Sequence, residues 1–496
     1  MWKISAIGAL LCILSGVTTT ASAVRRGDQV CTLSPDNQCS AGSIKPSELD
    51  GSVLIYPGGK TRCAFDDFAD PKGNFNTNKT YFFQVFPNQD QDKKKVMLFF
   101  QGGGACADDD TCNFSLQCSL GASPTFTSNA VPSSTGILNR TNTDNVFQDW
   151  NIIHIPYCTG DLHIGNAVHE PVDSAMGKRL GRSQCMGQNM STHLNGYENS
   201  LSALKWALAN YPNPEHLIIG GASAGSLAAQ ALSVVVADMW DVEKKSIRYS
   251  VLGDSYVGVL PEEKKPSGIV LDYFGTCDVE LKVPAGVVSD CKKHTLSVTE
   301  LYSSLIKQLP FSDWLFIDSK SDKTQRKFYA LLDQGILGYP FTNLISGDDF
   351  FASMTKMIDA YKTVSSRIST FFVESDKHVY LAYENYGAAA SGAGLLLGDF
   401  LKQWLLPHDD ATAASTAPAA SPETPASTPS VAPSQTPTPA AGDKTETPTP
   451  AAGSQTQPPA PAATEAPVPA APGTTSAPTI APAATPAATM TRSLCV

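Results

Sequence analysis

The chain has 496 residues and a formal net charge of −11, because 47 Asp and Glu residues outnumber 36 Lys and Arg residues. This balance excludes a general electrostatic attraction to nucleic acid or to a polyanionic polymer. We therefore expect no nucleic-acid partner, and an anionic substrate would have to be bound by local groups.

The N-terminus has the pattern of a secretory signal peptide over residues 1–23. Lys3 precedes an apolar run over residues 4–17, and the small residues Ala21-Ser22-Ala23 follow as a cleavage site. No later apolar stretch reaches the ~20 residues that a bilayer span requires, and the C-terminus lacks the apolar tail of a GPI signal. We expect a secreted, extracellular monomer without a membrane span.

Ten of the twelve cysteines lie between the signal peptide and the C-terminal tail. An even number in an exported chain predicts up to five disulfides, although the sequence does not give their pairing. Cys106, Cys112 and Cys118 could instead suggest zinc, but no matching histidine spacing accompanies them, so we expect neither metal nor cofactor. N-glycosylation sequons, which indicate a glycosylated surface, lie at Asn78, Asn113, Asn139 and Asn189.

Composition divides the exported chain after residue 408. Residues 409–496 are dominated by Ala, Pro, Thr and Ser, and they contain too few large apolar side chains to form a core. We expect a disordered tail, which either associates with a wall or glycan matrix or keeps the protein soluble. Residues 24–408 have the length of one large domain with insertions.

Strand-length apolar runs alternate with helical stretches along this domain. Apolar and polar residues do not alternate strictly in these runs, which is typical of strands buried on both faces of a sheet. The runs cover residues 96–100, 152–157, 217–220, 249–252, 314–317 and 370–373. The helical stretches cover residues 197–209, 227–240, 297–308, 325–332, 350–364 and 388–405. This order predicts an α/β fold with a mostly parallel sheet and helices on both faces, stabilised by disulfides.

A glycine run, Gln101-Gly102-Gly103-Gly104-Ala105-Cys106, follows the first of these strands. It could simply form a turn. In a parallel α/β sheet, however, functional groups collect beyond the carboxyl ends of the strands, where exposed backbone N–H groups can stabilise negative charge on a carbonyl oxygen. Gly103 and Gly104 are our candidates for that role.

The run over residues 217–220 leads into Gly221-Ala222-Ser223-Ala224-Gly225, a G-x-S-x-G pattern between a strand and a helix. This context is typical of the nucleophile elbow of α/β-hydrolases, in which flanking glycines allow a sharp, strained turn. We predict that Ser223 is a nucleophile. The N–H of Ala224, at the start of the next helix, would complete an oxyanion hole with the glycine run.

The order Ser, Asp, His of α/β-hydrolases selects the acid and the base. His378 follows the last predicted strand, and an imidazole can take and return a proton near neutral pH. Asp318 and Asp322 both follow the strand over residues 314–317 and compete as its carboxylate partner, while Asp376 reads as a solvated neighbour of the base. His163, His169 and His193 precede the elbow, and His154 lies within a strand.

Several motifs in order resemble the pectin acetylesterase and Notum family over most of residues 54–405. They are the glycine run, Asp149-Trp150-Asn151, residues 155–161 and the elbow. The resemblance implies a secreted α/β-hydrolase that deacylates esters through Ser, Asp and His without a metal. It also implies Asp322 as the acid, because the family's Asp-x-x-Gln phrase matches Asp322-Lys323-Thr324-Gln325.

The chain departs from this family near the expected site. Gln101 and Ala105 stand where the family usually has Glu and Trp, and Val379 rather than Cys follows His378. Plant members also carry Cys and Gly where this chain has Ala222 and Ser226. No triad candidate is lost, but the missing Trp alters the wall of the acyl pocket.

Three functions are compatible with these observations. The first is a secreted serine esterase that removes acetyl groups from pectin-like polysaccharide. The second is a Notum-like carboxylesterase acting on longer acyl groups of protein or lipid, and the third is a non-catalytic wall-associated surface protein. The intact set of nucleophile, acid, base and oxyanion-hole candidates argues against the third, because a binding module needs none of them.

Overall fold

The computed structural model describes residues 27–66, 80–88, 90, 92–114, 136–171, 191–264, 266–338 and 341–407. The chain forms two units, residues 1–413 with 495–496 and residues 414–494, and every described residue belongs to the first. The predicted signal peptide and tail lie outside the described residues.

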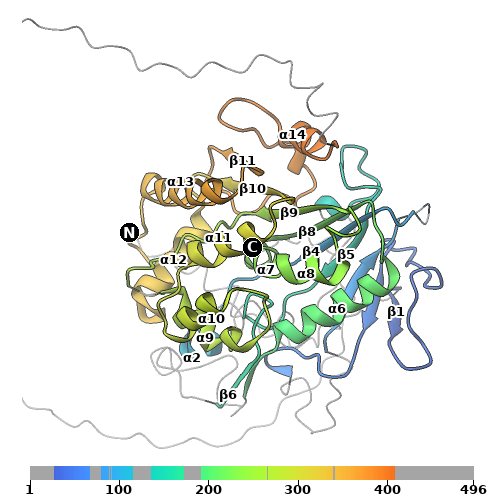
Figure 1. Cartoon of the computed structure of the whole chain (residues 1–496), viewed down its shortest axis with the longest axis horizontal. Helices are drawn as coiled ribbons and strands as arrows, with labels where there is room; N and C mark the ends of the chain where they lie inside the picture. The colour runs from blue at the N-terminus through green and yellow to red at the C-terminus, as the bar shows by residue number, and fades with distance from the viewer. Residues whose placement is uncertain are drawn as a thin grey trace, which may run out of the picture. The chain divides into compact units, whose positions relative to one another are not determined.

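A nine-stranded sheet forms the centre of the first unit, in the order β1-β2-β3-β5-β4-β8-β9-β10-β11 (Figure 1). β3 is antiparallel to β2 and β5, and all other neighbouring strands are parallel, which confirms the predicted mostly parallel sheet. A separate antiparallel pair joins β6 (Ala167–His169) to β7 (Thr192–Leu194). The strands of the large sheet are β1 (Gln29–Thr32), β2 (Val53–Tyr56), β3 (Phe83–Phe86), β4 (Lys95–Phe100), β5 (Asn151–Ile155), β8 (His216–Ala222), β9 (Arg248–Asp254), β10 (Asp313–Ser319) and β11 (Ile368–Val373).

The large sheet is buried on both faces, and successive side chains of a strand enter opposite cores. In β4, Val96 and Leu98 face the larger core, whereas Met97 and Phe99 face the smaller one. The larger core includes side chains of α6 (Gly196–Asn210), α7 (Ala224–Ala231), α8 (Ser233–Trp240), α11 (Val298–Gln308) and α13 (Gly347–Val364). The smaller core includes side chains of η3 (Gly136–Leu138) and α14 (Leu397–Trp404), so helices cover both faces, as predicted.

All six predicted strands are present, but two predicted helices were wrong in extent. The stretch 227–240 begins earlier, at Ala224, and is divided into α7 and α8 at Leu232. The stretch 388–405 is helical only over α14, because Ala390 and Leu396 form a β-bridge across a glycine-containing turn. The remaining helices are α2 (Asp109–Phe114), α9 (Ser267–Tyr273), η4 (Thr276–Asp278), α10 (Ala285–Lys292), α12 (Lys323–Gln334), η5 (Ile336–Gly338) and η6 (Tyr386–Ala388).

Disulfides bridge the described part of the chain at four places, as the cysteine count led us to expect. The pairs are Cys31–Cys39, Cys63–Cys158, Cys106–Cys112 and Cys277–Cys291. Cys118 and Cys185 lie outside the described residues. Because Cys106 and Cys112 are joined in a disulfide, the zinc alternative loses two of the three cysteines considered for it.

Two further sequence expectations concern the surface. Among the sequons, Asn139 is only 7% exposed, and its Nδ2 donates to Glu384 Oε1 at 3.3 Å. The sequence analysis expected this asparagine at the surface, and the structure instead buries it. The side chain of Asn113 and the whole of Asn78 and Asn189 lie outside the described residues. No helix within the described ranges is long and apolar enough to cross a membrane.

Candidate active site

The candidate site lies at the carboxyl edge of the parallel strands, where β4, β8, β9, β10 and β11 all end. Strand register sets this edge, because Phe100 of β4 pairs with Gly221 of β8, and Ala222 pairs with Asp254 of β9. β5 and β8 flank β4 on opposite sides, so the chain changes direction there, which in open α/β sheets leaves a crevice for ligands. The glycine run and the elbow emerge side by side at this point.

Ser223 occupies a strained turn between β8 and α7. Its backbone has φ 56° and ψ −121°, a combination that residues with a β-carbon rarely adopt. A β-carbon at Gly221 would lie 2.2 Å from Gly225 O, and one at Gly225 would lie 2.0 Å from Phe100 O. Both glycines are therefore sterically required, as the predicted nucleophile elbow demands.

The hydroxyl group of Ser223 is not used to cap the helix that it precedes. Ser223 is the N-cap residue of α7, yet its side chain makes no capping hydrogen bond, and the residue is partly exposed. Ala224 begins α7, and the first N–H groups of a helix have no partner within the helix. These N–H groups give the N-terminus of α7 a positive partial charge next to the serine.

The glycine run packs directly against this elbow. A β-carbon at Gly102 would lie 2.7 Å from Ala222 O and 2.8 Å from Ser223 Cβ, so the two loops are in close contact. A β-carbon at Gly103 would lie 2.6 Å from Cδ1 of the Tyr157 ring, and Gly104 has φ 77°. The structure thus places the start of the glycine run against Ser223 through Gly102, and Gly103 and Gly104 follow it directly in the chain.

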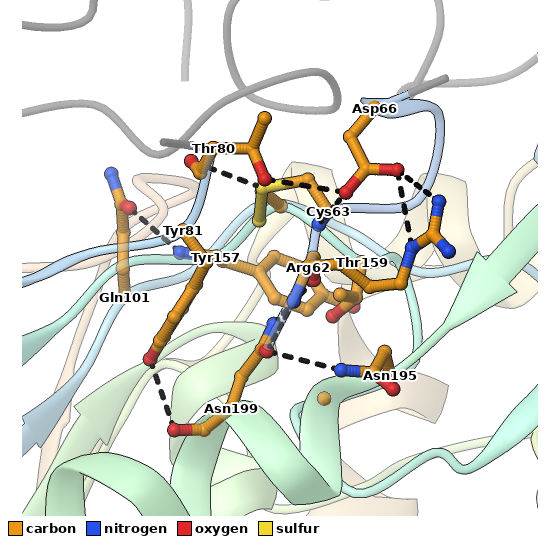
Figure 2. Close-up of a disulfide and its surroundings, with 12 residues drawn as sticks. Arg62, Cys63, Asp66, Thr80, Tyr81, Gln101, Tyr157, Thr159, Asn195 and Asn199 are labelled. Atoms are coloured by element: carbon orange, nitrogen blue, oxygen red, sulfur yellow. Dashed lines mark hydrogen bonds and ion pairs between the residues drawn. A yellow bond between two sulfur atoms is a disulfide. The ribbon is translucent and has the colours of Figure 1, made fainter. Parts of the chain in front are cut away.

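Buried groups on the loop after β5 hold the start of the glycine run. Gln101 Oε1 accepts a hydrogen bond from the Tyr157 N–H at 3.0 Å, next to the Cys63–Cys158 disulfide (Figure 2). The carbonyl oxygen of Gln101 lies 2.8 Å from His163 Nε2, and the His163 ring stacks on Tyr157 with 4.4 Å between centroids. A carbonyl only accepts, so His163 Nε2 carries the proton of this hydrogen bond.

Burial keeps this supporting histidine neutral. It lowers the pKa of His163 to about 4, and only the hydrogen bond to Gln101 opposes that shift. Asp161, which is also fully buried, accepts from Thr159 Oγ1, His163 N and Gly196 N, while burial raises its pKa to about 6. We infer that His163 supports the candidate oxyanion loop rather than acting as a base, which agrees with its place before the elbow.

His378 and Asp322 form a buried pair at the ends of β11 and β10. His378 Nδ1 lies 2.8 Å from Asp322 Oδ2, and the two residues are 8% and 0% exposed. Asp322 is the N-cap of α12, and its Oδ1 accepts from the N–H groups of Thr324 and Gln325, both at 2.9 Å. These capping hydrogen bonds satisfy Oδ1 and fix the orientation of the carboxyl group, so that Oδ2 faces the imidazole.

The second nitrogen of the imidazole is available for proton transfer. His378 Nε2 is buried and has no hydrogen-bond partner among the described residues, so no hydrogen bond to the Ser223 hydroxyl is formed in this structure. Such catalytic hydrogen bonds are often long without substrate and tighten when it binds. The Nδ1 contact with a carboxylate fixes the tautomer that leaves Nε2 free to accept a proton.

The end of β9 attaches both the serine and the histidine loop. Ser223 N donates to the carbonyl oxygen of Asp254 at 2.8 Å. The carboxylate of Asp254 accepts from the N–H groups of Tyr380 and Leu381, and Ser255 Oγ accepts from Val379 N at 2.8 Å. Asp254 and Ser255 therefore link the elbow to the segment that follows His378, a role that the sequence analysis missed although both residues follow a predicted strand.

The other candidates take structural positions. His154 is buried in β5, where burial lowers its pKa to about 3, and His294 pairs with Asp272 on the surface. Asp376 is exposed, as expected for a solvated neighbour. Asp318 is fully buried near the pair and contacts Gln325 rather than a histidine, so the geometry favours Asp322 as the partner of the base.

The described ranges contain no group of three or more His, Cys, Asp or Glu side chains that could hold a metal ion. The expectation that the protein needs no metal stays a prediction. What the arrangement could do without one is nucleophilic acyl transfer, because a strained serine at a helix N-terminus and a buried His–Asp pair lie at one edge.

Comparison with known proteins gives one family and a similar solved structure. The sequence model of the family described as Pectinacetylesterase matches residues 77–247, a range that includes Gly103 and Ser223 but neither Asp322 nor His378. The Wnt deacylase Notum from Drosophila is similar with a TM-score of 0.47 and 15% identity, over 70% of this chain and 91% of that chain. No curated protein matches. Over residues 77–247 the family match agrees with the resemblance to pectin acetylesterases that the sequence motifs indicated.

Proposed function

We propose that this chain, which matches the pectinacetylesterase family over residues 77–247, is a secreted serine esterase that removes acetyl groups from pectin-like polysaccharide. The observation that carries the proposal is the meeting, at one sheet edge, of a strained serine elbow with a buried His–Asp pair. A binding protein has no use for either feature.

The proposed reaction runs through an acyl-enzyme. His378 Nε2 takes the proton of the Ser223 hydroxyl as its oxygen attacks the ester carbonyl, and Asp322 stabilises the resulting imidazolium. The carbonyl electron pair moves onto oxygen, where the N–H groups of Gly103, Gly104 and Ala224 would donate to it. Collapse of this intermediate breaks the ester bond, and the imidazolium returns the proton to the sugar alkoxide.

Water completes the cycle in a second acyl transfer, in which water is the nucleophile and Ser223 is the leaving group. His378 removes one proton from water as the water oxygen attacks the acetyl-serine carbonyl, and it then returns this proton to Ser223 as acetic acid leaves and ionises in solvent. No oxidant, metal or cofactor enters either half of the reaction. The acyl length that the site accepts depends on the side chains around the acyl group. Ala105, which the sequence resemblance aligns with the family's usual Trp, is almost fully buried.

The test compares short and long p-nitrophenyl esters with acetylated pectin. We expect acetate release from pectin and faster turnover of the acetyl ester than of a long-chain ester. Ser223→Ala should abolish both activities, whereas Ser366→Ala, at an exposed serine before β11, should leave them unchanged. Preference for the long-chain ester would favour the Notum-like alternative, and full activity in Ser223→Ala would refute the proposed nucleophile.

The proposal includes secretion and the division of the chain into a domain over residues 24–408 and a tail over residues 409–496. The disulfides of the described residues fit an oxidising compartment. A chain ending at residue 410 should keep its turnover of a small acetyl ester and lose retention on acetylated wall material. A large fall in turnover, or a new free thiol in the shortened protein, would show that the tail belongs to the folded enzyme.

A further inference from the structure

A second buried carboxyl group lies behind the His378–Asp322 pair. Gln325 Nε2 donates to Asp318 Oδ1 at 2.8 Å and to Asp322 Oδ2 at 3.0 Å, and Asp322 Oδ2 contacts His378 Nδ1 at 2.8 Å. Asp318, Asp322 and Gln325 are all 0% exposed. One amide nitrogen therefore joins two carboxyl groups, and only one of these touches the base.

The two carboxyl groups have different sets of donors. Asp322 receives four: two backbone N–H groups, the Gln325 amide and His378. Asp318 Oδ1 accepts from Ser319 N and from Gln325, but Asp318 Oδ2 has no partner among the described residues. A buried carboxylate needs donors on both oxygens, so this arrangement suits an ionised Asp322 and a neutral Asp318.

The surroundings of Asp318 also disfavour a second charge. Two further buried polar atoms, Gln325 Oε1 and Tyr256 Oη, lack partners within the described part of the chain. Gln325 Oε1 can only accept a hydrogen bond, whereas the Tyr256 hydroxyl can donate or accept, and in this structure neither lies within bonding distance of Asp318 Oδ2. Without a donor on Oδ2, a negative charge on Asp318 would be poorly solvated. Burial raises the pKa of Asp318 well above its ordinary value, and the charges of Asp322 and Asp254 raise it further.

The ionisable groups around Asp318 belong to several elements. They are Asp322 at the start of α12, Asp254 and Tyr256 at the end of β9, Tyr380 after β11 and, beyond Asp322, His378. Except for His378, each is acidic, so no cation in this set favours ionisation of Asp318. A second negative charge here would repel the Asp322 carboxylate.

We propose that Asp318 is a neutral carboxylic acid in the folded enzyme and a positioning residue that, through Gln325, holds the Asp322 carboxylate against His378. This inference rests on the proposed function in assigning His378 as the base. The state of Asp318 itself does not depend on that assignment, and the two are tested separately.

The kinetic test replaces Asp318 by asparagine and by alanine. Asparagine keeps the Oδ1 acceptor for Gln325 and supplies an N–H donor where the acid has its O–H, so Asp318→Asn should retain kcat/KM within about threefold of wild type. Asp318→Ala removes the acceptor and should lower kcat by about tenfold or more with little change in KM. Asp376→Asn, which removes an exposed carboxylate from the same loop as His378, serves as the control for charge loss.

The stability test needs no activity. If Asp318 holds its proton when folded but loses it when unfolded, wild-type stability falls as pH rises above its unfolded pKa, and Asp318→Asn escapes this loss. The unfolding midpoint of Asp318→Asn relative to wild type should therefore increase from about pH 5 to about pH 8, while that of Asp376→Asn stays level. Should Asp318→Asn fail to fold, the infrared carbonyl band of a protonated carboxylic acid in wild type at about pH 7.5 decides the question.

The outcomes separate the two proposals. A level midpoint difference across this pH range, or no carboxylic acid band, overturns the neutral Asp318. An Asp318→Asn variant as slow as Asp318→Ala overturns the positioning role, because the conservative replacement should rescue it. Wild-type protein without Ser223-dependent activity refutes the proposed function alone, since the midpoint comparison and the infrared band still report on Asp318.

Discussion

Replacing Ser223 by glycine should give a more stable protein than replacing it by alanine, because the backbone at this position suits a residue without a β-carbon. Ser223 has φ 56° and ψ −121°, and strain at such a position costs about 1–3 kcal/mol. Glycine in turn loses about 0.5–1 kcal/mol more conformational entropy than alanine on folding. The balance leaves Ser223→Gly more stable by about 1 kcal/mol.

Guanidinium unfolding of the two variants at one pH measures this difference, and both lack the proposed nucleophile. Ser366 provides the control, since it is exposed and its φ is not positive. At this position Ser366→Gly should be less stable than Ser366→Ala, because no backbone strain is relieved and glycine loses more conformational entropy on folding. If Ser223→Gly is no more stable than Ser223→Ala while the control behaves as expected, the elbow stores no strain and our reading of its backbone is wrong.

Three other perturbations test the site. His378→Ala should lower kcat by about 10⁴-fold or more, and adding it to Ser223→Ala should cost little further, since triad members act as a unit; additive losses in the kinetic cycle would contradict the pairing. Gly225→Ala should destabilise the fold by at least about 1–3 kcal/mol, because its β-carbon would lie 2.0 Å from the last carbonyl oxygen of β4. Gly286→Ala, which meets no atom within 4 Å, should not destabilise it in the same thermal assay. Lowering the pH from about 6.5 to about 4 should cost wild type up to about 1.4 kcal/mol per pH unit through His163, because its folded pKa is lowered to about 4 and only the unfolded chain takes up the proton. His163→Gln should lack this part of the slope in unfolding titrations.

Most of the central sheet could be predicted from the sequence, because apolar runs indicated six of its nine strands. The runs that became β4, β8 and β10 are buried on both faces, and such runs are recognisable without knowledge of their neighbours. β1 and β3 were missed because polar residues interrupt their apolar pattern, Gln29 and Thr32 in β1 and Gln84 in β3. β2 was missed although its apolar run is as long as others that were recognised. The antiparallel direction of β3 depends on the neighbours it pairs with, which the sequence does not show.

The predicted helix over residues 388–405 shows how composition can mislead. Alanine and leucine are strong helix formers, but this stretch also contains glycines that favour turns. In the structure Ser391 N bonds to Leu395 O, and Ser391 bridges to Val373 of β11. Pairing with the sheet outweighed local helix propensity, and only the amphipathic last part became α14.

Ser223 and His378 became candidates because each lies in a pattern with a chemical reason of its own, whereas Asp322 was chosen over Asp318 by the family resemblance. The residues that hold them in place gave no such signal, since an aspartate that accepts backbone N–H groups looks the same in sequence as a solvated one. Asp161 and Asp254 are both 0% exposed, and each accepts from backbone N–H groups of a loop at the site. Burial raises the pKa of each to about 6, so both carboxylates are kept buried at a cost in free energy. That cost is reasonable where a loop must hold a fixed geometry, because a buried acceptor with several donors leaves the backbone few alternative positions. We infer that the precision of the proposed site comes from these buried carboxylates as much as from the strands that carry its reactive groups.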